Sequence, residues 1–410
     1  MKLNYGKTFL IGLAFFSASM VWPIYNTFVP IILDRFIQSA FWIGIIMSFD
    51  NIFGVVFQPL FGALSDRTNT RYGRRMPYLL VGVPLAALFF SLIPIANSLF
   101  PLMVFIIITV FSMGIYRAPA VALMPDVTPS PLRSKANGVI NFMGGVAAAI
   151  GYGVGGILYE QNQGYPFYLG SIVMVVALII LYLFFKEPEI TEAPDRQEEK
   201  GPESREEVKG RLMSLIFILL AIFFWFTGFN AVETFFSLYC SKILAIEPGL
   251  ASRMLFLFTG AFVIFAIPAG FVASRLGRRN TILTGLAGLL LLFIALNFLK
   301  DLLIIRILLV LGGIFWAFIN INSYPMVVEM ASSRGIGAYT GYYYFFSFSA
   351  AIVSPILFGW IADRAGSYQP LFVYASVAFL LAFFFMMLVK HGDVSPAAKN
   401  LSEIPEQGNP

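Results

Sequence analysis

The sequence predicts an all-α membrane protein with twelve transmembrane helices in two pseudo-symmetric six-helix bundles. The composition, the spacing of the apolar runs and an internal repeat lead to this prediction. Of the 410 residues, 59% are hydrophobic and 12% are charged, whereas a soluble protein carries about 45–50% apolar and about 25% charged residues. Because the apolar excess runs along the whole chain, the composition indicates a membrane protein.

The apolar runs give the order of the spans. A spanning helix needs about 20 mostly apolar residues, and the chain contains twelve such runs, which cover residues 8–33, 41–64, 77–96, 101–124, 135–158, 166–185, 212–240, 251–273, 280–298, 302–326, 337–361 and 370–389. We read the first run as a retained span, since it has no small-residue cleavage site. Residues 1–186 form the N-terminal six-helix half and residues 212–390 the C-terminal half. We expect the polar segment 187–211 to be a cytoplasmic linker and residues 391–410 a disordered tail.

The distribution of basic residues predicts the orientation. With the N-terminus in the cytoplasm, 20 of the 27 Lys and Arg residues fall in cytoplasmic segments. This bias places both termini of a multi-pass cell-membrane protein in the cytoplasm. The net charge of +5 therefore reflects orientation in a lipid bilayer, and we expect no nucleic-acid partner.

Three pairs of matching segments reveal an internal repeat. The stretch from Gly62 to Arg67 after the second run matches that from Gly270 to Arg275 after the eighth, 208 residues later. Asp126 matches Glu329 at an offset of 203 residues, and Asn26 matches Asn230 at an offset of 204 residues. Two parallel halves with a pathway between them are typical of transporters.

Rare residue types narrow the function. The single cysteine, Cys240, allows no intramolecular disulfide, and the single histidine, His391, argues against a histidine-based metal site or catalytic triad. The sequence contains no nucleophile–base pair and no phosphate-binding loop. We therefore expect no enzymatic activity, no metal and no cofactor.

At the loop after the second run the sequence resembles the major facilitator superfamily, and the resemblance covers all twelve spans. A narrower resemblance, to the sucrose/proton symporters, rests on the segments 58–62, 65–68 and 71–77, on Arg117-Ala118, and on Arg133 with Ala136-Asn137. That group is related to the glycoside–pentoside–hexuronide cation symporters. Their sodium-coupled members place a carboxylate before the proline of span two, where this chain has Gln58. The resemblance therefore implies protons rather than sodium as the coupling ion.

Three charged residues within spans are the candidates for proton coupling. Asp50 lies about 15 Å deep in the second span, where ionisation is costly, so it suits a group that loads and releases a proton. The alternative is a structural carboxylate, hydrogen-bonded to Asn51 or to a neighbouring helix. Arg117 in the fourth span either helps Asp50 to release its proton, binds solute, or packs against helix carbonyls. Glu233 in the seventh span, near its outer boundary, is either a coupling site or a solvated outer-gate residue.

Aromatic and amide side chains that share helix faces are the candidates for substrate binding. Such faces suit sugars, whose C–H faces stack on rings while their hydroxyls form hydrogen bonds; packing between membrane helices is the alternative. The candidates are Trp22, Asn26, Asn137, Asn141, Asn230, Trp316, Asn320 and Tyr324.

Charged and small residues at the cytoplasmic helix ends are the candidates for a conformational switch. We expect them to form ion pairs between the halves and helix-end contacts that close the inner side; a static topological role is the alternative. They are Gly62, Asp66, Arg67, Arg74, Arg75, Asp126, Arg133, Gly270, Arg275, Arg278, Arg279, Glu329 and Arg334. The glycine-rich segment 151–156 resembles a motif of drug/proton antiporters, with Tyr152 where that motif has proline, and we assign it a packing role.

The expected function is secondary active transport of a small solute. The favoured hypothesis is proton-coupled symport of a sugar or glycoside by a monomer that alternates access between the two sides of the membrane. Proton-coupled efflux of drugs or metabolites and a non-transporting membrane receptor are the alternatives.

Overall fold

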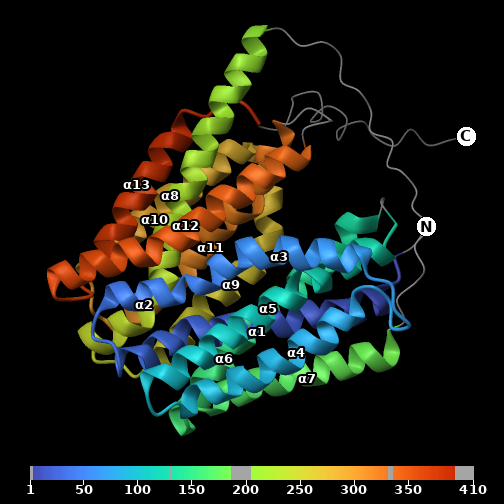
Figure 1. Cartoon of the computed structure of the whole chain (residues 1–410). Helices are drawn as coiled ribbons and strands as arrows, with labels where there is room; N and C mark the ends of the chain where they lie inside the picture. Colours follow the sequence, from blue (N-terminus) through green and yellow to red (C-terminus); the bar gives the residue numbers. More distant parts are fainter. Residues whose placement is uncertain (1–2, 130–131, 186–204, 331–335, 393–410) are drawn as a thin grey trace, which may run out of the picture.

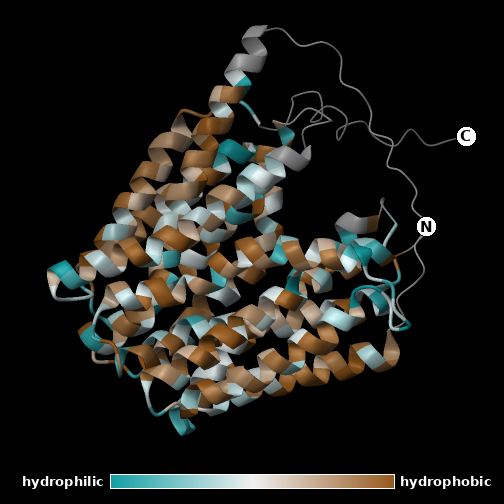
Figure 2. Cartoon of the chain, in the orientation of Figure 1, coloured by the Kyte–Doolittle hydropathy of each residue, from teal (hydrophilic) through white to brown (hydrophobic). Residues whose placement is uncertain are grey.

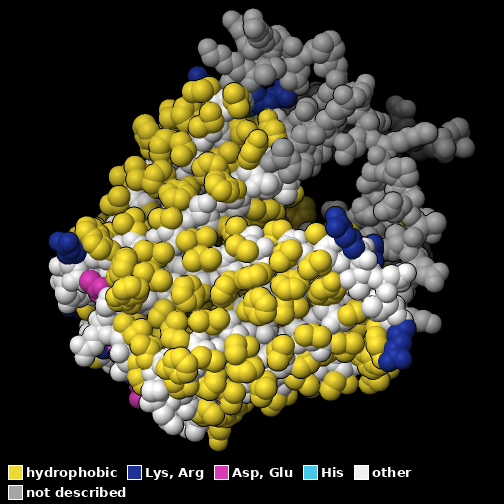
Figure 3. Space-filling view, viewed as in Figure 1, with side chains coloured by type: hydrophobic (Ala, Val, Ile, Leu, Met, Phe, Trp, Pro, Cys, Tyr) yellow, Lys and Arg dark blue, Asp and Glu magenta, His cyan; other side chains and the backbone are white. Residues whose placement is uncertain are grey.

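The computed structural model describes residues 3–129, 132–185, 205–330 and 336–392, and their regular structure is helical. Eleven of the helical segments in this part of the chain are long and apolar enough to cross a membrane, and a shorter apolar helix, α13 (Leu371–Met387), completes the predicted twelve. Hydrophobic residues predominate along the helices (Figure 2), and hydrophobic side chains cover most of the face seen in Figure 3, as expected for a protein surrounded by lipid.

The first six spans form one bundle (Figure 1). Its helices are α1 (Tyr5–Asp34), α2 (Ala40–Met47), α3 (Phe49–Arg67), α4 (Met76–Leu92), the 3-10 turn η1 (Ile93–Ile95), α5 (Leu99–Val127), α6 (Arg133–Gln161) and α7 (Tyr165–Phe184). Together α2 and α3 make the second span, with a break at Ser48. The Ser48 hydroxyl donates a hydrogen bond to the Gly44 carbonyl at 2.8 Å and lies 3.0 Å from the Ile352 carbonyl.

The second bundle contains α8 (Arg205–Ile243), α9 (Pro248–Leu276), α10 (Arg278–Leu296), α11 (Leu302–Glu329), α12 (Ile336–Ala365) and α13. Most of the predicted linker lies outside the described residues, but its last part, from Arg205, already belongs to α8. Of the predicted tail only His391 and Gly392 are described. His391 contacts α8, with its Nδ1 atom 2.9 Å from the Ser214 hydroxyl.

The helix ends define two faces of the molecule. We call the face where α1 begins and α13 ends the termini face, and the opposite face, where α1 and α8 end and α2 and α9 begin, the far face. The two bundles contact each other most extensively along α6 with α9 and along α2 with α12.

The bundles meet closely toward the far face. Any side chain at Gly44 or Gly359 would collide with the backbone of the opposite bundle, and a Cβ atom at Gly156 would lie 2.6 Å from the Gly249 carbonyl oxygen. At the termini-face ends of the same helices the space is open, since a Cβ atom at Gly138 or Gly270 would meet nothing within 4 Å. Figure 3 shows the molecule hollowed between the bundles at this end. The structure is therefore closed at the far face and open at the termini face.

Candidate functional site

Asp50 lies in the first turn of α3, ten residues from the start of α2 and so about 15 Å from the far face. Its Oδ1 atom accepts hydrogen bonds from the backbone and side-chain nitrogens of Asn51, both at 2.7 Å. The hydrogen bond with Asn51 that the alternative of a structural carboxylate predicts is therefore present. Asp50 is also within electrostatic range of Arg117 and Glu233, so the three predicted coupling residues form one group.

Arg117 lies on α5 with its guanidinium carbon 5.5 Å from the centre of the Trp22 ring. No described residue forms a hydrogen bond or a direct ion pair with this guanidinium, and it interacts electrostatically with Asp50 and Tyr344. The alternative that Arg117 packs against helix carbonyls is therefore not what the described residues show. The guanidinium keeps its hydrogen-bond donors available for a ligand.

Glu233 lies ten residues before the end of α8, about 15 Å from the far face and level with Asp50. Because α8 continues to Ile243, beyond the predicted end of the seventh span, Glu233 lies deeper along its helix than the sequence predicts. The Tyr152 hydroxyl, on α6 of the other bundle, donates to Glu233 Oε1 at 3.4 Å. The Asn26 side chain, also in the first bundle, interacts with Glu233 as well, so this carboxylate links the two bundles at mid-membrane.

Two of the predicted substrate residues form aromatic platforms. Trp22 makes an edge contact with Tyr25, and Trp316 stacks on Phe229 with a centroid distance of 4.2 Å. Trp316 is buried, and its ring is occupied by this contact with Phe229. Trp22 is only partly buried, and its Nε1 atom has no hydrogen-bond partner among the described residues.

The predicted amides divide into two groups. Asn26 and Asn230 lie near the centre, where Asn230 donates to the Phe226 carbonyl of its own helix at 2.7 Å. Asn137 and Asn141 lie on the exposed surface of α6 toward the termini face, and the Asn141 amide donates to the Asn137 side chain at 2.9 Å. The two pairs therefore do not form one binding site in this conformation.

A cluster of tyrosines lies between the central group and the termini face. Tyr324 on α11, which was predicted, packs against Tyr343 and Tyr344 of α12 with centroid distances of 5.3 and 6.3 Å. Asn320 lies one helical turn away on α11, partly buried. Tyr344 is within electrostatic range of Arg117, so the aromatic surface continues up to the charged group.

Sequence reasoning missed three tyrosines at the centre: Tyr25, Tyr152 and Tyr344. Tyr25 is fully buried, and its hydroxyl has no hydrogen-bond partner among the described residues. A buried hydroxyl without a partner costs about 1–3 kcal/mol. A bound solute or water that accepts from Tyr25 and from Trp22 Nε1 would remove this cost. The sequence does contain one signal for Tyr152, because this residue replaces the proline of the antiporter glycine motif.

The switch candidates form ion pairs at the termini face, but within each bundle. Arg75 pairs with Asp126 at 2.9 Å and with Asp66 at 2.5 Å, and Arg74 pairs with Asp126 at 3.0 Å. In the second bundle Arg278 pairs with Glu329. These pairs between described residues therefore lie within the bundles rather than across the halves, since the bundles are apart at this face.

The electrostatics of Arg75 follow from these pairs. Burial lowers the pKa of Arg75, but the hydrogen bonds and charges of Asp126 and Asp66 raise it more, so the net shift is upward. Arg75 also donates to the Ser65 hydroxyl at 2.5 Å and to the Gly62 carbonyl at 3.4 Å. The buried guanidinium therefore holds the end of α3 against α5.

The other switch candidates are less connected. Arg279 donates to the carbonyls of Met387 and Val389 at 2.7 and 2.6 Å and so ties α10 to the end of α13. Arg67 and Arg275 are exposed, and Gly270 has open space around it. The Arg133 side chain and Arg334 lie outside the described residues.

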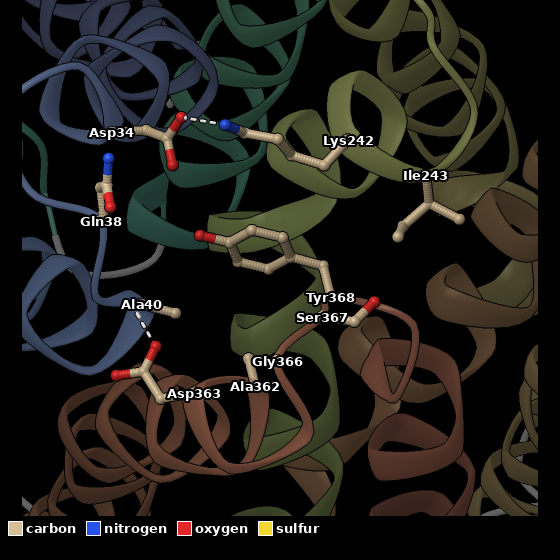
Figure 4. Close-up of a pocket in the computed structure, with 10 residues that line it drawn as sticks. All are labelled: Asp34, Gln38, Ala40, Lys242, Ile243, Ala362, Asp363, Gly366, Ser367 and Tyr368. Carbon is tan, nitrogen blue, oxygen red and sulfur yellow. Dashed lines mark hydrogen bonds and ion pairs between the residues drawn. The ribbon is translucent and has the colours of Figure 1, made fainter.

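Polar contacts between the bundles close the far face (Figure 4). Lys242 of α8 forms an ion pair with Asp34 of α1 at 2.6 Å. Asp363, at the end of α12, accepts hydrogen bonds at the start of α2 from the Ser39 hydroxyl at 2.6 Å and from the backbone nitrogens of Ala40 and Phe41 at 2.7 and 3.2 Å. Asp34, Lys242 and Asp363 line a cavity of about 470 Å³.

The ion pairs follow the internal repeat. Arg74 and Arg278 are 204 residues apart, and their partners Asp126 and Glu329 are 203 residues apart. At the far face Glu160, which pairs with Arg253 at the start of α9, precedes Asp363 by the same 203 residues. Each bundle therefore supplies one acid that holds the start of a helix in the other bundle.

The Asp66→Asn variant is expected to slow transport while leaving equilibrium solute affinity within about threefold. Asp66 is 16 residues along the helix from Asp50, about 24 Å away, and it contacts Arg75 rather than the central group. The Arg71→Gln change in the same loop is the matched control, since the Arg71 guanidinium lies over the ring of its neighbour Tyr72 and donates to its hydroxyl, away from Asp66 and Arg75 in the described structure. Transport rates and binding isotherms on both variants check this. A collapse of affinity with an unchanged conformational balance would contradict the switch role.

The Asp363→Ala variant is expected to increase the ratio of far-face-open to far-face-closed molecules about fivefold. The change removes a helix cap worth about 1 kcal/mol that exists only in the closed state. Spin labels at Asn97 and Lys300, on a Cys240→Ser background, report the distance between the two bundles at this face.

The Asp301→Ala variant is the matched control, because Asp301 caps α11 through the nitrogens of Leu303 and Ile304 within one bundle. It should leave the distance distribution unchanged. If both variants shift the distribution equally, Asp363 stabilises a helix and does not hold the face closed.

Two six-helix bundles that meet at one face, separate at the other and enclose charged and aromatic side chains define a multi-pass membrane transporter. The family model of the Major Facilitator Superfamily matches residues 11–252 and 240–408. The chain therefore belongs to the major facilitator superfamily, as a transporter of small solutes and not an enzyme.

The names of the individual relatives refer to different solutes. The chain is 27% identical over 275 residues to the class H tetracycline resistance protein of Pasteurella multocida, covering 63% of this chain and 64% of that protein. It is 25% identical over 384 residues to the hexuronate transporter of Bacillus subtilis, covering 84% and 85%. A bacterial homologue of the human lysosomal transporter Spinster, in an inward-facing and occupied conformation, has the same fold, with a TM-score of 0.74 at 13% identity over 95% of this chain and 97% of that one.

Proposed function

We propose that the chain is a monomeric proton-coupled symporter of the cell membrane that takes up a sugar or glycoside by alternating access. One observation carries the proposal: Asp50 lies at mid-membrane within electrostatic reach of both Arg117 and Glu233, beside partly buried aromatic and amide groups. Intramembrane ionisable groups facing the bundle interior are by default functional. The 25% identity to a hexuronate transporter supports a sugar-like solute.

In the proposed cycle the far face opens first, and Asp50 takes a proton from outside water. The neutral carboxyl group then allows solute to bind between Trp22 and the tyrosine cluster, where Arg117 and the Tyr25 hydroxyl supply donors. After closure of the far face, the conformation described here, water reaches the site from the termini face. Arg117 then favours the Asp50 anion, and the proton leaves with the solute.

The uptake experiment tests this proposal. Purified protein in proteoliposomes is given a panel of labelled sugars, sugar acids and glycosides, with and without a pH gradient that is acidic outside. We expect at least one compound to accumulate only with the gradient. Proton-coupled efflux of drugs or metabolites is the second candidate, favoured by the 27% identity to a tetracycline resistance protein. Under that alternative, a drug would move against the proton flux and no sugar would accumulate.

A thiol placed at Ser204, in the predicted linker, is expected to react with a membrane-impermeant maleimide only after cells are permeabilised. The proposed orientation places the termini face and the linker in the cytoplasm. The measurement uses Ser204→Cys on a Cys240→Ser background, since Cys240 is buried and free. Lys300→Cys at the far face is the control and should react in intact cells. Reaction of the Ser204 position in intact cells would reverse the orientation.

A further inference from the structure

A groove runs along the outer surface of the molecule where the two bundles meet. It lies between α6 of the first bundle and α9 and α11 of the second, and it has a volume of about 650 Å³. Its lining is mainly apolar and includes Val154, Ile157 and Phe256, which are 41%, 48% and 41% exposed. Because these residues belong to spanning helices, the groove opens toward the acyl chains of the bilayer.

Two arginines line the same groove at its end near the far face. Arg253 is five residues from the start of α9 and Arg306 is four residues from the start of α11, so both lie about 6–8 Å along their helices from this face. This depth corresponds to the boundary between head groups and acyl chains. Arg306 has exposed apolar neighbours on both sides, Leu303 and Ile307, and therefore lies on a lipid-facing surface.

The charges of the two arginines are only partly balanced. Arg253 Nη2 pairs with Glu160 at 2.5 Å, but its Nε atom is buried without a hydrogen-bond partner among the described residues. Arg306 forms no hydrogen bond or ion pair within the described part of the chain. With one carboxylate for two guanidinium groups, the groove ends in a net charge of +1. An unpaired arginine at a membrane boundary is costly unless it meets water or an anionic head group.

We propose that this groove binds an anionic phospholipid, with the phosphate between Arg306 and Arg253 and one acyl chain along α6. Basic pockets between transmembrane helices bind anionic head groups on the cytoplasmic side of membranes, and the same charge complementarity applies to this groove at the far face. The groove exists only while the ends of α6 and α9 are in contact, because the two bundles supply opposite walls. A bound lipid therefore stabilises the conformation that is closed at the far face. This goes beyond solute transport and does not depend on which solute is carried.

Native mass spectrometry of the purified protein tests the proposal with added phosphatidylglycerol or phosphatidylcholine. We expect phosphatidylglycerol to bind preferentially and the Arg306→Gln variant to weaken its binding about five- to tenfold. The Val154→Trp variant fills the groove without changing charge and should weaken binding as well. Arg364→Gln is the matched control, since Arg364 lies at the far face but stacks over Trp360, at 5.2 Å, outside the groove.

A second experiment distinguishes binding of a lipid from binding of a free phosphate compound. Glycerol phosphate at the same concentration should not displace phosphatidylglycerol, because the acyl chain supplies part of the affinity. Displacement by glycerol phosphate, equal binding of the two lipids, or equal losses in Arg306→Gln and Arg364→Gln would each overturn the proposal. Monodisperse elution and an unchanged melting temperature show that the variants are folded. A variant that fails this check is replaced by Ile157→Trp, which fills the same groove.

Discussion

Replacement of Asp50 by asparagine is expected to abolish accumulation of solute driven by a pH gradient, while exchange of solute across the membrane is retained. Asparagine resembles the protonated carboxyl group in shape and charge, so solute still binds and the conformations still interconvert. It takes up no proton, so the gradient cannot drive the cycle. The Asn51 nitrogens that donate to Asp50 in the structure still find an acceptor in the asparagine side-chain carbonyl, which limits structural damage.

Glu233→Gln is the comparison variant, since Glu233 lies at the same depth and also faces the other bundle. A smaller loss of accumulation is expected there if Asp50 carries the proton. Accumulation and counterflow in proteoliposomes separate the two effects. If the Asp50→Asn protein still accumulates solute under a pH gradient, Asp50 is structural and Glu233 becomes the coupling residue.

Replacement of Asp126 by alanine is expected to reduce the free energy of unfolding by about 3 kcal/mol, because it leaves a buried cation without its main counter-charge. The Arg75 side chain is 5% exposed and pairs with Asp126 at 2.9 Å, and Arg74 pairs with the same carboxylate. The loss is measured by unfolding in mixed micelles at increasing denaturing-detergent content.

The control for this prediction uses the same arginine. Asp66 also pairs with Arg75, but its side chain is 59% exposed, and exposed pairs contribute about 0–1 kcal/mol. Asp66→Ala should therefore change stability little. Equal losses from Asp126→Ala and Asp66→Ala would show that burial of the carboxylate does not determine the strength of its pair with Arg75.

Much of the fold is predictable from the sequence because the bilayer imposes a simple rule on it. Spans of about 20 apolar residues are required, and helices satisfy every backbone polar group within one segment. The internal repeat further predicts that the chain forms two related six-helix bundles. The repeat also relates Glu160 to Asp363, at the same offset as Asp126 and Glu329. Glu160 and Asp363 both hold the far face closed.

The site was only partly predictable, for reasons of long-range geometry. Helix periodicity places residues on a face but does not say which helix that face meets. Trp316 is an example, because its face packs on Phe229 within one bundle. Tyr152 is the opposite case, since it belongs to a glycine-rich packing segment yet reaches Glu233 across the interface. Hydropathy alone does not locate the break at Ser48, which lies within one apolar run. It also does not give the ends of α8, because this helix continues through polar residues.

The ion pairs at the termini face illustrate a second limit. Sequence places charges at helix ends but does not specify the conformational state. With the termini face open, Arg75 and Arg278 have partners in their own bundles. We propose that contacts between the bundles at this face form in a second conformation of the same chain, in which the termini face is closed.

The most direct measurement of the central claim is the pH inside proteoliposomes when solute is added in the absence of any gradient. A pH-sensitive dye is trapped inside, and the solute identified by uptake is added outside. Coupled entry of solute and proton predicts acidification of the interior that is lost in Asp50→Asn, while labelled solute still exchanges. Solute entry with no change in internal pH, or with a rise in internal pH, would contradict proton symport.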